Sequence, residues 1–364
     1  MKKGLTTYIA LALLLASCAS KSGDMTRVVG RFSHDAPESV EISISLLANK
    51  DILDTTVIVD NGRFEVEIPK YLLNGAILQT GSSQVGFLSD GSTITIDPEA
   101  GTAVSSNKKG PHTNYVAYLD WMENYESEFR TKMAEFSGDE EAAEACSKEM
   151  NRAFIEFQRK AAKANPDNVV GLQAVIQHQL YSDDYSETIA LFDGLSDEIK
   201  AIPGLDSMRA QLVSMAESTP RTAEGKPFVD FTVIQDPDHP ESSTVRFSDY
   251  IGRGKYVLVD FRASGCGPCK AEMPFLVKVY NTYHGDRFDM LSIAVLDKVE
   301  DSTEAASSLG IVWNQIVNAQ EIPTTLYGID GIPHIILFGP DGTILKRNLR
   351  GEKIEETVKE ALGL

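Results

Sequence analysis

Residues 257–270 read VLVDFRASGCGPCK, and they decide the fold of the C-terminal part of the chain. The first five are almost continuously apolar, as in a strand at the centre of an α/β sheet that is covered on both faces. A short loop then leads to Cys266-Gly267-Pro268-Cys269. Pro268 is expected in the first turn of a helix, where N–H groups have no helical partner and proline is tolerated. The pattern predicts a buried strand, a loop that presents Cys266, and a helix.

The place of Cys266 at the start of this helix predicts its chemistry. Free backbone N–H groups and the positive end of the helix dipole stabilise a thiolate and lower the pKa of a cysteine. Cys266 is therefore expected to attack disulfides. Cys269 lies further into the helix and is better covered, so it is expected to resolve the mixed disulfide.

A CxxC pair also occurs as half of a zinc site, but the rest of the chain argues against a metal. Zinc needs a second Cys or His pair at ligand spacing, and the 6 histidines are scattered singly. We expect no metal and no cofactor besides the redox-active disulfide of Cys266 and Cys269.

Strands and helices continue to alternate from residue 228 to the end. Apolar runs at 290–295 and 334–338 predict two further strands of the sheet, and residues 352–362 predict a final helix. The fold class expected for residues 228–364 is α/β.

The part of the chain before residue 228 divides into regions that differ in the spacing of their apolar side chains. Residues 27–110 alternate apolar and polar side chains with period two, and Asn61-Gly62 is a strong hairpin signal, so we expect a small antiparallel, sandwich-like β-domain. Residues 111–218 carry aromatic and methionine side chains at helical spacing, which predicts a helical region with these side chains in its core. A peptide groove between the helices is the alternative. Residues 219–227 are predicted to be a linker.

The N-terminus has the pattern of an export signal. Lys2 and Lys3 precede an apolar run at 8–16 that is too short for a permanent membrane span, so residues 1–17 are predicted to be a signal peptide. The following Cys18 completes LASC, which resembles the lipobox of bacterial lipoproteins. The resemblance implies a lipid on Cys18, a tether over 18–26, and soluble domains in the periplasm, with the choice of inner or outer membrane left open. An ordinary cleaved signal is the alternative.

Composition limits the remaining functions. The 364 residues are 42% hydrophobic and carry a net charge of -19, which is typical of a folded soluble protein and argues against a nucleic-acid partner. With Cys18 lipidated, Cys146 is the one cysteine outside the pair. It lies on a helical pattern and is expected to be a small buried hydrophobe.

Three segments, at 259–261, 266–270 and 327–333, together resemble thioredoxins. Residues 228–364 as a whole resemble the membrane-tethered TlpA/ResA-like branch, with the closer match at 231–233, 248–250 and 271–274. The β-domain also resembles one that often precedes thioredoxin modules in envelope lipoproteins of Bacteroidetes.

The resemblance implies further site residues. Pro333 corresponds to a cis-proline that faces the dithiol, and Ile332 would offer backbone groups to an extended substrate. Asp260 corresponds to a buried aspartate that helps to deprotonate the resolving cysteine, and burial would raise its pKa. Glu272 matches a glutamate near the site, although an exposed helix glutamate is the common case. Gly265 and Pro268, beside the cysteines, complete the expected substrate-binding residues.

Three positions depart from the family pattern. Arg262 and Gly265 stand where the family usually has tryptophan, and the missing aromatic at Gly265, next to the nucleophile, removes an apolar rim over the dithiol. Arg262 either helps to hold the thiolate or points to solvent. His334 replaces a common threonine and is expected at the surface, or else to titrate near the pair.

These observations predict a membrane-anchored thiol-disulfide oxidoreductase that reduces exported proteins. Gly-Pro between the cysteines resembles reducing thioredoxins. A disulfide oxidase or isomerase, a thiol peroxidase and a non-catalytic binding lipoprotein remain as alternatives, although the peroxidase loop Pro-x-x-x-Thr-x-x-Cys is missing. The expected partners are exported proteins with disulfides, the membrane through Cys18, and a transmembrane thiol electron donor.

Overall fold

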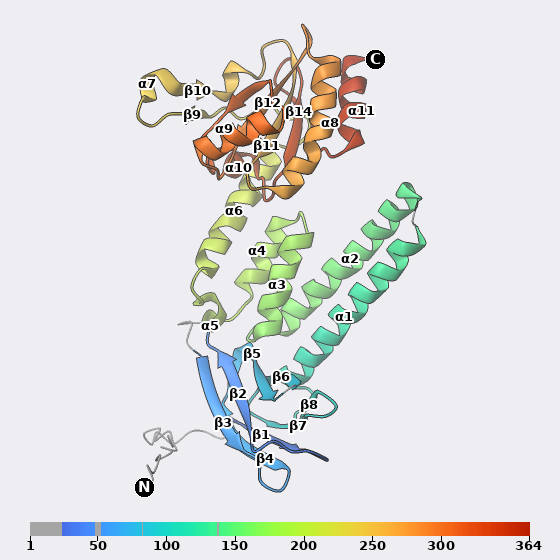
Figure 1. Ribbon diagram of the computed structural model, residues 1–364, viewed down its shortest axis with the longest axis vertical. Coiled ribbons are helices and arrows are strands. Elements are labelled where there is room, and N and C mark those ends of the chain that lie inside the picture. The colour runs from blue at the N-terminus through green and yellow to red at the C-terminus, as the bar shows by residue number, and fades with distance from the viewer. Residues whose placement is uncertain (1–23, 48–51, 82, 137) are drawn as a thin grey trace, which may run out of the picture. The chain divides into compact units, whose positions relative to one another are not determined.

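The computed structural model describes residues 24–47, 52–81, 83–136 and 138–364 (Figure 1). The chain forms two compact units, one of Met1–Asp183 with Ala190–Asp206 and one of Asp184–Ile189 with Ser207–Leu364. The predicted signal peptide and Cys18 lie outside the described residues. Within the described ranges, no helix has the length and apolar character to cross a membrane.

The first unit begins with two four-stranded sheets that share one core. Their orders are β4-β1-β7-β8 and β3-β2-β5-β6, and every pairing is antiparallel except that of β1 with β7. Val28, Ile42, Phe64 and Leu78 belong to the single cluster that both sheets bury, which makes the predicted sandwich-like domain. The strands are β1 (Met25–Arg31), β2 (Ser39–Ser45), β3 (Ile52–Ile58), β4 (Arg63–Pro69), β5 (Tyr71–Thr80), β6 (Ser83–Ser89), β7 (Thr93–Asp97) and β8 (Thr102–Ser105).

A helical region follows, as the change of period predicts. It comprises α1 (Pro111–Glu135), α2 (Glu140–Ala164), α3 (Val169–Tyr181), α4 (Tyr185–Asp193), α5 (Asp197–Lys200) and α6 (Leu205–Arg221). The rings of Trp121 in α1 and Phe157 in α2 stack with their centroids 3.5 Å apart. The buried ring of His112 joins α1 to the β-domain, because its Nδ1 accepts from the Leu88 N–H and its Nε2 faces the carbonyl of Ala103.

Cys146 differs from its expected place. It lies in α2 as a free cysteine with intermediate exposure, so it is not a buried core residue. The helical period placed it correctly on a helix, but period alone does not say how fully the neighbouring helices cover a residue at the edge of the apolar stripe.

The second unit contains the α/β sheet. Its strand order is β13-β12-β11-β14-β15, with β11, β12 and β13 parallel and β14 and β15 antiparallel to their neighbours. The central strand β11 sends Val259 and Phe261 into one apolar cluster and Leu258 into another, so both of its faces are buried. The elements are β9 (Thr232–Ile234), α7 (Pro240–Ser243), β10 (Thr244–Arg246), β11 (Tyr256–Arg262), α8 (Gly267–Tyr283), β12 (Phe288–Ala294), α9 (Val299–Ser308), β13 (Asn314–Ile316), α10 (Ile322–Tyr327), β14 (His334–Phe338), β15 (Ile344–Lys346) and α11 (Glu352–Leu362).

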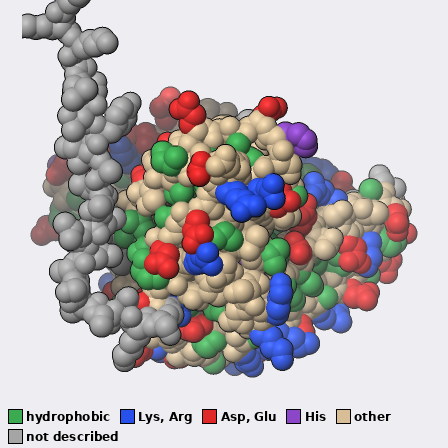
Figure 2. All heavy atoms as spheres, turned by 90° about the horizontal axis from the view of Figure 1, so that it is seen from below, with side chains coloured by type: hydrophobic (Ala, Val, Ile, Leu, Met, Phe, Trp, Pro, Cys, Tyr) green, Lys and Arg blue, Asp and Glu red, His purple; other side chains and the backbone are tan. Residues whose placement is uncertain are grey.

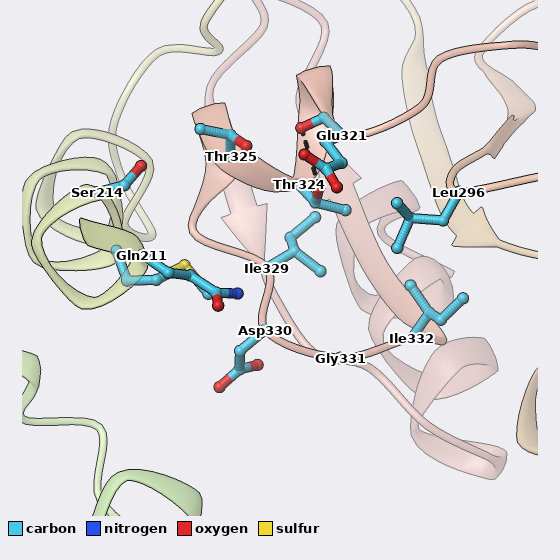
Figure 3. A pocket seen from close by; sticks show the side chains of 11 residues that line it. Gln211, Ser214, Leu296, Glu321, Thr324, Thr325, Ile329, Asp330, Gly331 and Ile332 are labelled. Carbon is cyan, nitrogen blue, oxygen red and sulfur yellow. Dashed lines mark hydrogen bonds between the residues drawn. The ribbon is translucent and has the colours of Figure 1, made fainter. Parts of the chain in front are cut away.

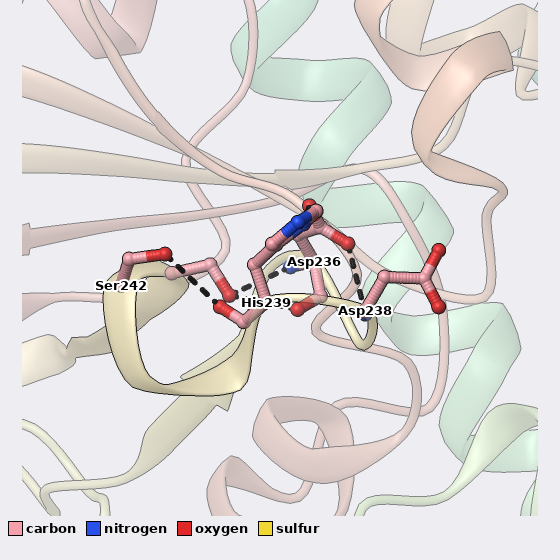
Figure 4. A network of polar contacts seen from close by, with 5 residues as sticks. Asp236, Asp238, His239 and Ser242 are labelled. Atoms are coloured by element: carbon pink, nitrogen blue, oxygen red, sulfur yellow. Dashed lines mark hydrogen bonds and ion pairs between the residues drawn. The ribbon is translucent and has the colours of Figure 1, made fainter.

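The loop between β9 and β10 is closed by its own polar groups (Figure 4). Asp236 accepts a hydrogen bond from the Asp238 N–H at 3.0 Å and contacts His239 Nδ1 at 2.8 Å. Ser242 in turn donates to the His239 carbonyl. These short-range bonds are typical of a turn that Asp and Ser side chains stabilise, and they account for the clustering of polar residues here.

The expected linker at 219–227 is part of the second unit. Helix α6 continues to Arg221, and Thr222 is fully buried with its hydroxyl donating to the Tyr327 carbonyl at 3.1 Å. Beyond it, the Gly225 N–H donates to Ile344 and the Ile344 N–H donates to Lys226. Proline and glycine made the segment resemble a connection, but hydrogen bonds to residues more than a hundred positions away fix it on the α/β fold.

Charged side chains are mixed on the face shown in Figure 2. Lys and Arg side chains lie among Asp and Glu side chains over the described part of that face.

Candidate active site

The two cysteines of the pair are joined as a disulfide at the start of α8. Cys266 is the N-cap, its Sγ accepts a hydrogen bond from the Cys269 N–H at 3.1 Å, and Pro268 lies in the first turn. Cys266 is half-buried, whereas Cys269 is only 2% exposed. The accessible sulfur is therefore that of Cys266, which is the one expected to attack a substrate.

A proline loop faces the disulfide. The Ile332–Pro333 peptide bond is cis, and the Ile332 carbonyl oxygen lies 3.7 Å from Cys266 Sγ. Arg350 contacts the Pro333 carbonyl oxygen and also donates to the Leu349 carbonyl at 2.8 Å. Gly265 and Pro268 are exposed beside the cysteines in the chain. Of the four residues predicted to bind substrate, Ile332 has a direct contact with Cys266, and the binding role of all four stays a prediction.

Asp260 lies in the middle of β11, two residues before the loop that carries the pair. Its side chain is fully buried, the Ser292 hydroxyl donates to one oxygen at 3.3 Å, and the other oxygen has no partner among the described residues. Burial raises the pKa of Asp260 to about 7, while the nearby Arg262 cation opposes the rise. A carboxyl with this pKa exchanges a proton near neutral pH, as a general base for a thiol requires.

Glu272 is neither exposed nor free. It is half-buried on α8 and accepts a hydrogen bond from the Gly351 N–H at 2.8 Å, at the start of α11. This bond ties two helices that pack on the same face of the sheet. The structure thus gives Glu272 a structural contact, and its predicted part in catalysis stays a prediction.

Arg262 does not point to solvent. It is 1% exposed, and its guanidinium donates to the Ser302 carbonyl at 3.4 Å and to the Gln315 amide oxygen at 3.1 Å. Two of its nitrogens, Nε and Nη1, have no partner among the described residues. Burial lowers the pKa of Arg262, and the carboxylates of Asp260 and Asp297 oppose this. A cation thus occupies a buried position at which the resemblance to thioredoxins implies a tryptophan.

His334 is buried, contrary to the expected surface position. It is 9% exposed, and its Nε2 lies 3.4 Å from an Arg347 nitrogen. Burial, together with the charges of Arg347 and Arg350, lowers the pKa of His334 to about 3. The imidazole is therefore neutral near pH 7 and does not act as a titrating group beside the pair.

Helix α6 adds a wall that the sequence pattern does not reveal. A cleft of about 480 Å³ lies between α6 and the loop from Ile329 to Ile332, directly beside the residue that faces Cys266 (Figure 3). Gln211 contributes from α6 and Leu296 from the loop after β12. Neither belongs to a motif, and only the place of Leu296 directly after a strand on the same edge of the sheet hints at the site.

No group of three or more His, Cys, Asp and Glu side chains is placed to hold a metal ion in the described residues. The chemistry that this geometry offers is that of the sulfur pair and the buried carboxyl.

Comparisons with known proteins agree on the C-terminal unit. Residues 225–347 match the model of the AhpC/TSA family. The chain is 26% identical to the thiol-disulfide oxidoreductase ResA of Geobacillus thermodenitrificans over 117 residues, which are 32% of this chain and 66% of that protein. The match therefore spans just under two thirds of that relative.

Two further relatives cover more of their own length. A thioredoxin of Mycolicibacterium smegmatis is 34% identical over 95 residues, 26% of this chain and 75% of that protein. Among solved structures, the thioredoxin domain of a thiol-disulfide oxidoreductase from Bacteroides vulgatus is 33% identical, covering 38% of this chain and 96% of that one, with a TM-score of 0.33. The chain belongs to the thioredoxin family and carries at its C-terminus a ResA/TlpA-like thiol-disulfide oxidoreductase domain.

Proposed function

We propose that this protein is a membrane-anchored thiol-disulfide oxidoreductase that reduces disulfides of exported proteins. The observation that supports it most is the accessible sulfur of Cys266 at the N-terminus of α8, with the cis-Pro333 loop 3.7 Å away at the Ile332 carbonyl. The fully buried Asp260 on the adjoining strand adds a proton acceptor.

The reduction proceeds in two exchanges. The Cys266 thiolate attacks one sulfur of the substrate, a Cys266–substrate disulfide forms, and the substrate disulfide breaks to release a thiolate. Cys269, deprotonated with Asp260 as base, then attacks Cys266 and releases the second substrate thiolate. Two electrons pass from the dithiol to the substrate, and the Cys266–Cys269 disulfide remains.

A reductase assay separates this function from that of a binding lipoprotein. We expect the reduced wild-type chain to reduce insulin and Cys266→Ala to lose this activity. Cys146→Ala is the matched control, because Cys146 lies in the other compact unit, and it should retain the wild-type rate. Equal rates for wild type and Cys266→Ala would support a non-catalytic function.

The direction of exchange is tested by the reduction potential of the pair. The Gly-Pro dipeptide between the cysteines supports reduction, so we expect a value near that of thioredoxin, about -270 mV. A value near that of strong oxidants, about -120 mV, would identify an oxidase instead.

The membrane anchor is proposed from the lipobox at Cys18. We expect the exported wild type to fractionate with membranes and to carry a lipid that Cys18→Ser lacks. Recovery of Cys18→Ser in the membrane fraction would argue against the anchor.

A reductase outside the cytoplasm needs electrons from within, so a transmembrane thiol carrier is the proposed donor. Trapping mixed disulfides with Cys269→Ala would identify substrates.

Peroxide reduction is the second candidate, because the matching family model is that of AhpC/TSA proteins. The threonine and proline positions of the peroxidase loop, read back from Cys266, hold Ala263 and Val259. We therefore expect the reduced protein to leave hydrogen peroxide unconsumed on the timescale of insulin reduction.

A further inference from the structure

We infer that α6 forms one wall of the substrate site, and that the site selects a disulfide-bearing polypeptide segment with an apolar side chain, and no acidic one, near its cysteine. This inference rests on the proposed function, since it concerns which disulfides the Cys266–Cys269 pair reduces.

Helix α6 is held firmly on the proline side of the site. Arg347 donates to the Thr222 carbonyl at 2.7 Å and to the Tyr327 carbonyl at 2.6 Å, while the Thr222 hydroxyl also donates to Tyr327. Gly328 follows at once, and a Cβ atom placed there would lie 2.5 Å from Thr219 Oγ1. The end of α6 therefore packs directly against the segment that leads to Ile332.

The cleft and the reactive sulfur share one neighbour, Ile332. Ile332 lines the cleft with its side chain and approaches Cys266 with its carbonyl oxygen. In Figure 3, Gln211 reaches from α6 toward the loop of Ile329 and Asp330, while Leu296 and Ile332 lie on the opposite side. An extended segment whose disulfide reaches Cys266 therefore has room for a neighbouring side chain in this cleft.

Leu296 provides the strongest sign that this side chain is apolar. Its side chain is 60% exposed although it is a large hydrophobic residue, and its backbone has φ of 52°. A left-handed conformation is unfavourable for leucine, and such strain concentrates at functional sites. Ile329 and the partly buried Ile332 extend the apolar surface into the cleft.

The charges of the cleft disfavour an acidic side chain. Glu321 and Asp330 line it, and no Lys, Arg or His is among its described lining residues. The Asp330 carboxylate accepts a hydrogen bond from the Tyr185 hydroxyl at 3.0 Å. A third carboxylate, from a substrate, would meet two like charges, whereas a lysine would be attracted.

Peptide disulfides test this selectivity on the reduced full chain. Three peptides with one cysteine and a neighbouring Leu, Lys or Asp are oxidised to homodimers, and their reduction rates are compared with that of glutathione disulfide. Rates with dithiothreitol correct for intrinsic reactivity. We expect the Leu peptide to react about tenfold faster than the Asp peptide, in the range that one side chain in an apolar pocket provides.

Two substitutions connect the selectivity to the cleft. Leu296→Asn introduces a residue that tolerates positive φ but removes the apolar group. It should reduce the ratio of the Leu-peptide rate to the Asp-peptide rate to about twofold or less. Gln211→Lys brings a cation to the α6 wall and should accelerate the Asp peptide severalfold. The matched controls are Val312→Asn, also exposed and outside the cleft, and Ala210→Lys on the exposed side of α6, which should leave all ratios unchanged.

The outcomes separate the inference from the function on which it rests. Equal corrected rates for the three peptides, with glutathione disulfide still reduced, would contradict substrate selection by the cleft but not the proposed reductase function. Equal effects of Gln211→Lys and Ala210→Lys would overturn the assignment of α6 as the wall. Failure to reduce any disulfide would contradict the proposed function itself.

Discussion

Two buried titratable side chains on the paired strands β11 and β14 have pKa values that shift in opposite directions from one physical cause. Burial penalises the charged form, so it raises the pKa of Asp260 to about 7 and lowers that of His334 to about 3. Both groups are therefore largely uncharged in the folded protein at weakly acidic pH. Their contributions to stability depend on pH with opposite signs.

Asp260→Asn tests the shift of the carboxyl. Because the folded pKa lies above the unfolded value of 3.8, the unfolded chain releases this proton first, and stability is lost as pH rises from 3.8 to about 7. Asn has no carboxyl to ionise, so the variant does not lose this stability. With the Cys266–Cys269 disulfide formed in both proteins, we expect the free energy of unfolding of the variant minus that of wild type to be larger at pH 8 than at pH 5, by about 2 to 3 kcal/mol.

Urea unfolding at the two pH values measures this difference, and the His334 contribution cancels because both proteins contain it. Asp238→Asn is the control, because Asp238 is exposed in the β9–β10 loop. A free-energy difference between variant and wild type that decreased with rising pH would contradict the raised pKa of Asp260.

Arg262→Met tests the cation that replaces a tryptophan. The change keeps a long side chain but removes the charge that lowers the pKa of Asp260, so that pKa should rise above its wild-type value. Carbon NMR of the Asp260 carboxyl measures it directly. Arg253→Gln, at an exposed position, should leave it unchanged. An unchanged value in Arg262→Met would show that the guanidinium does not act on Asp260.

At the scale of elements, Gly328 decides how α6 meets the α/β fold. It ends α10 in the left-handed region, with φ of 59°, and its missing Cβ makes room for Thr219. Two constraints thus meet at one glycine: a conformation that other residues rarely adopt, and a close contact with another helix.

Gly328→Ala should therefore lower the free energy of unfolding by more than the cost of placing alanine in the left-handed region alone. Gly310→Ala is a matched control, because Gly310 has φ of 72° and open space around its Cβ position. We expect about 1 kcal/mol for Gly310→Ala and about 2 to 4 kcal/mol for Gly328→Ala in urea unfolding. Equal losses would mean that Thr219 moves aside at no cost.

At the scale of the whole molecule, the second compact unit begins before the thioredoxin pattern does. A fragment of residues 207–364 contains most of α6 and the hydrogen bonds of Thr222, Gly225 and Lys226, whereas a fragment of 228–364 lacks them. We expect the shorter fragment to be less stable by about 2 kcal/mol or more, at about 1 kcal/mol for each lost hydrogen bond.

Thermal or urea unfolding of the two fragments measures the difference. Equal stability would mean that the stable α/β unit begins at residue 228 and that α6 does not contribute to its stability.

Local patterns along the chain were enough to predict several of its elements. The apolar run to Phe261, the proline after Cys266 and the alternation in residues 27–110 predicted the central strand, the reactive helix and the β-domain, because periodicity and helix-end chemistry act over a few residues. Long-range packing decided the rest. Only tertiary structure buried Arg262 and His334, paired Glu272 with Gly351, and placed α6 beside Ile332, since the partners of these residues lie on distant segments that no local pattern identifies.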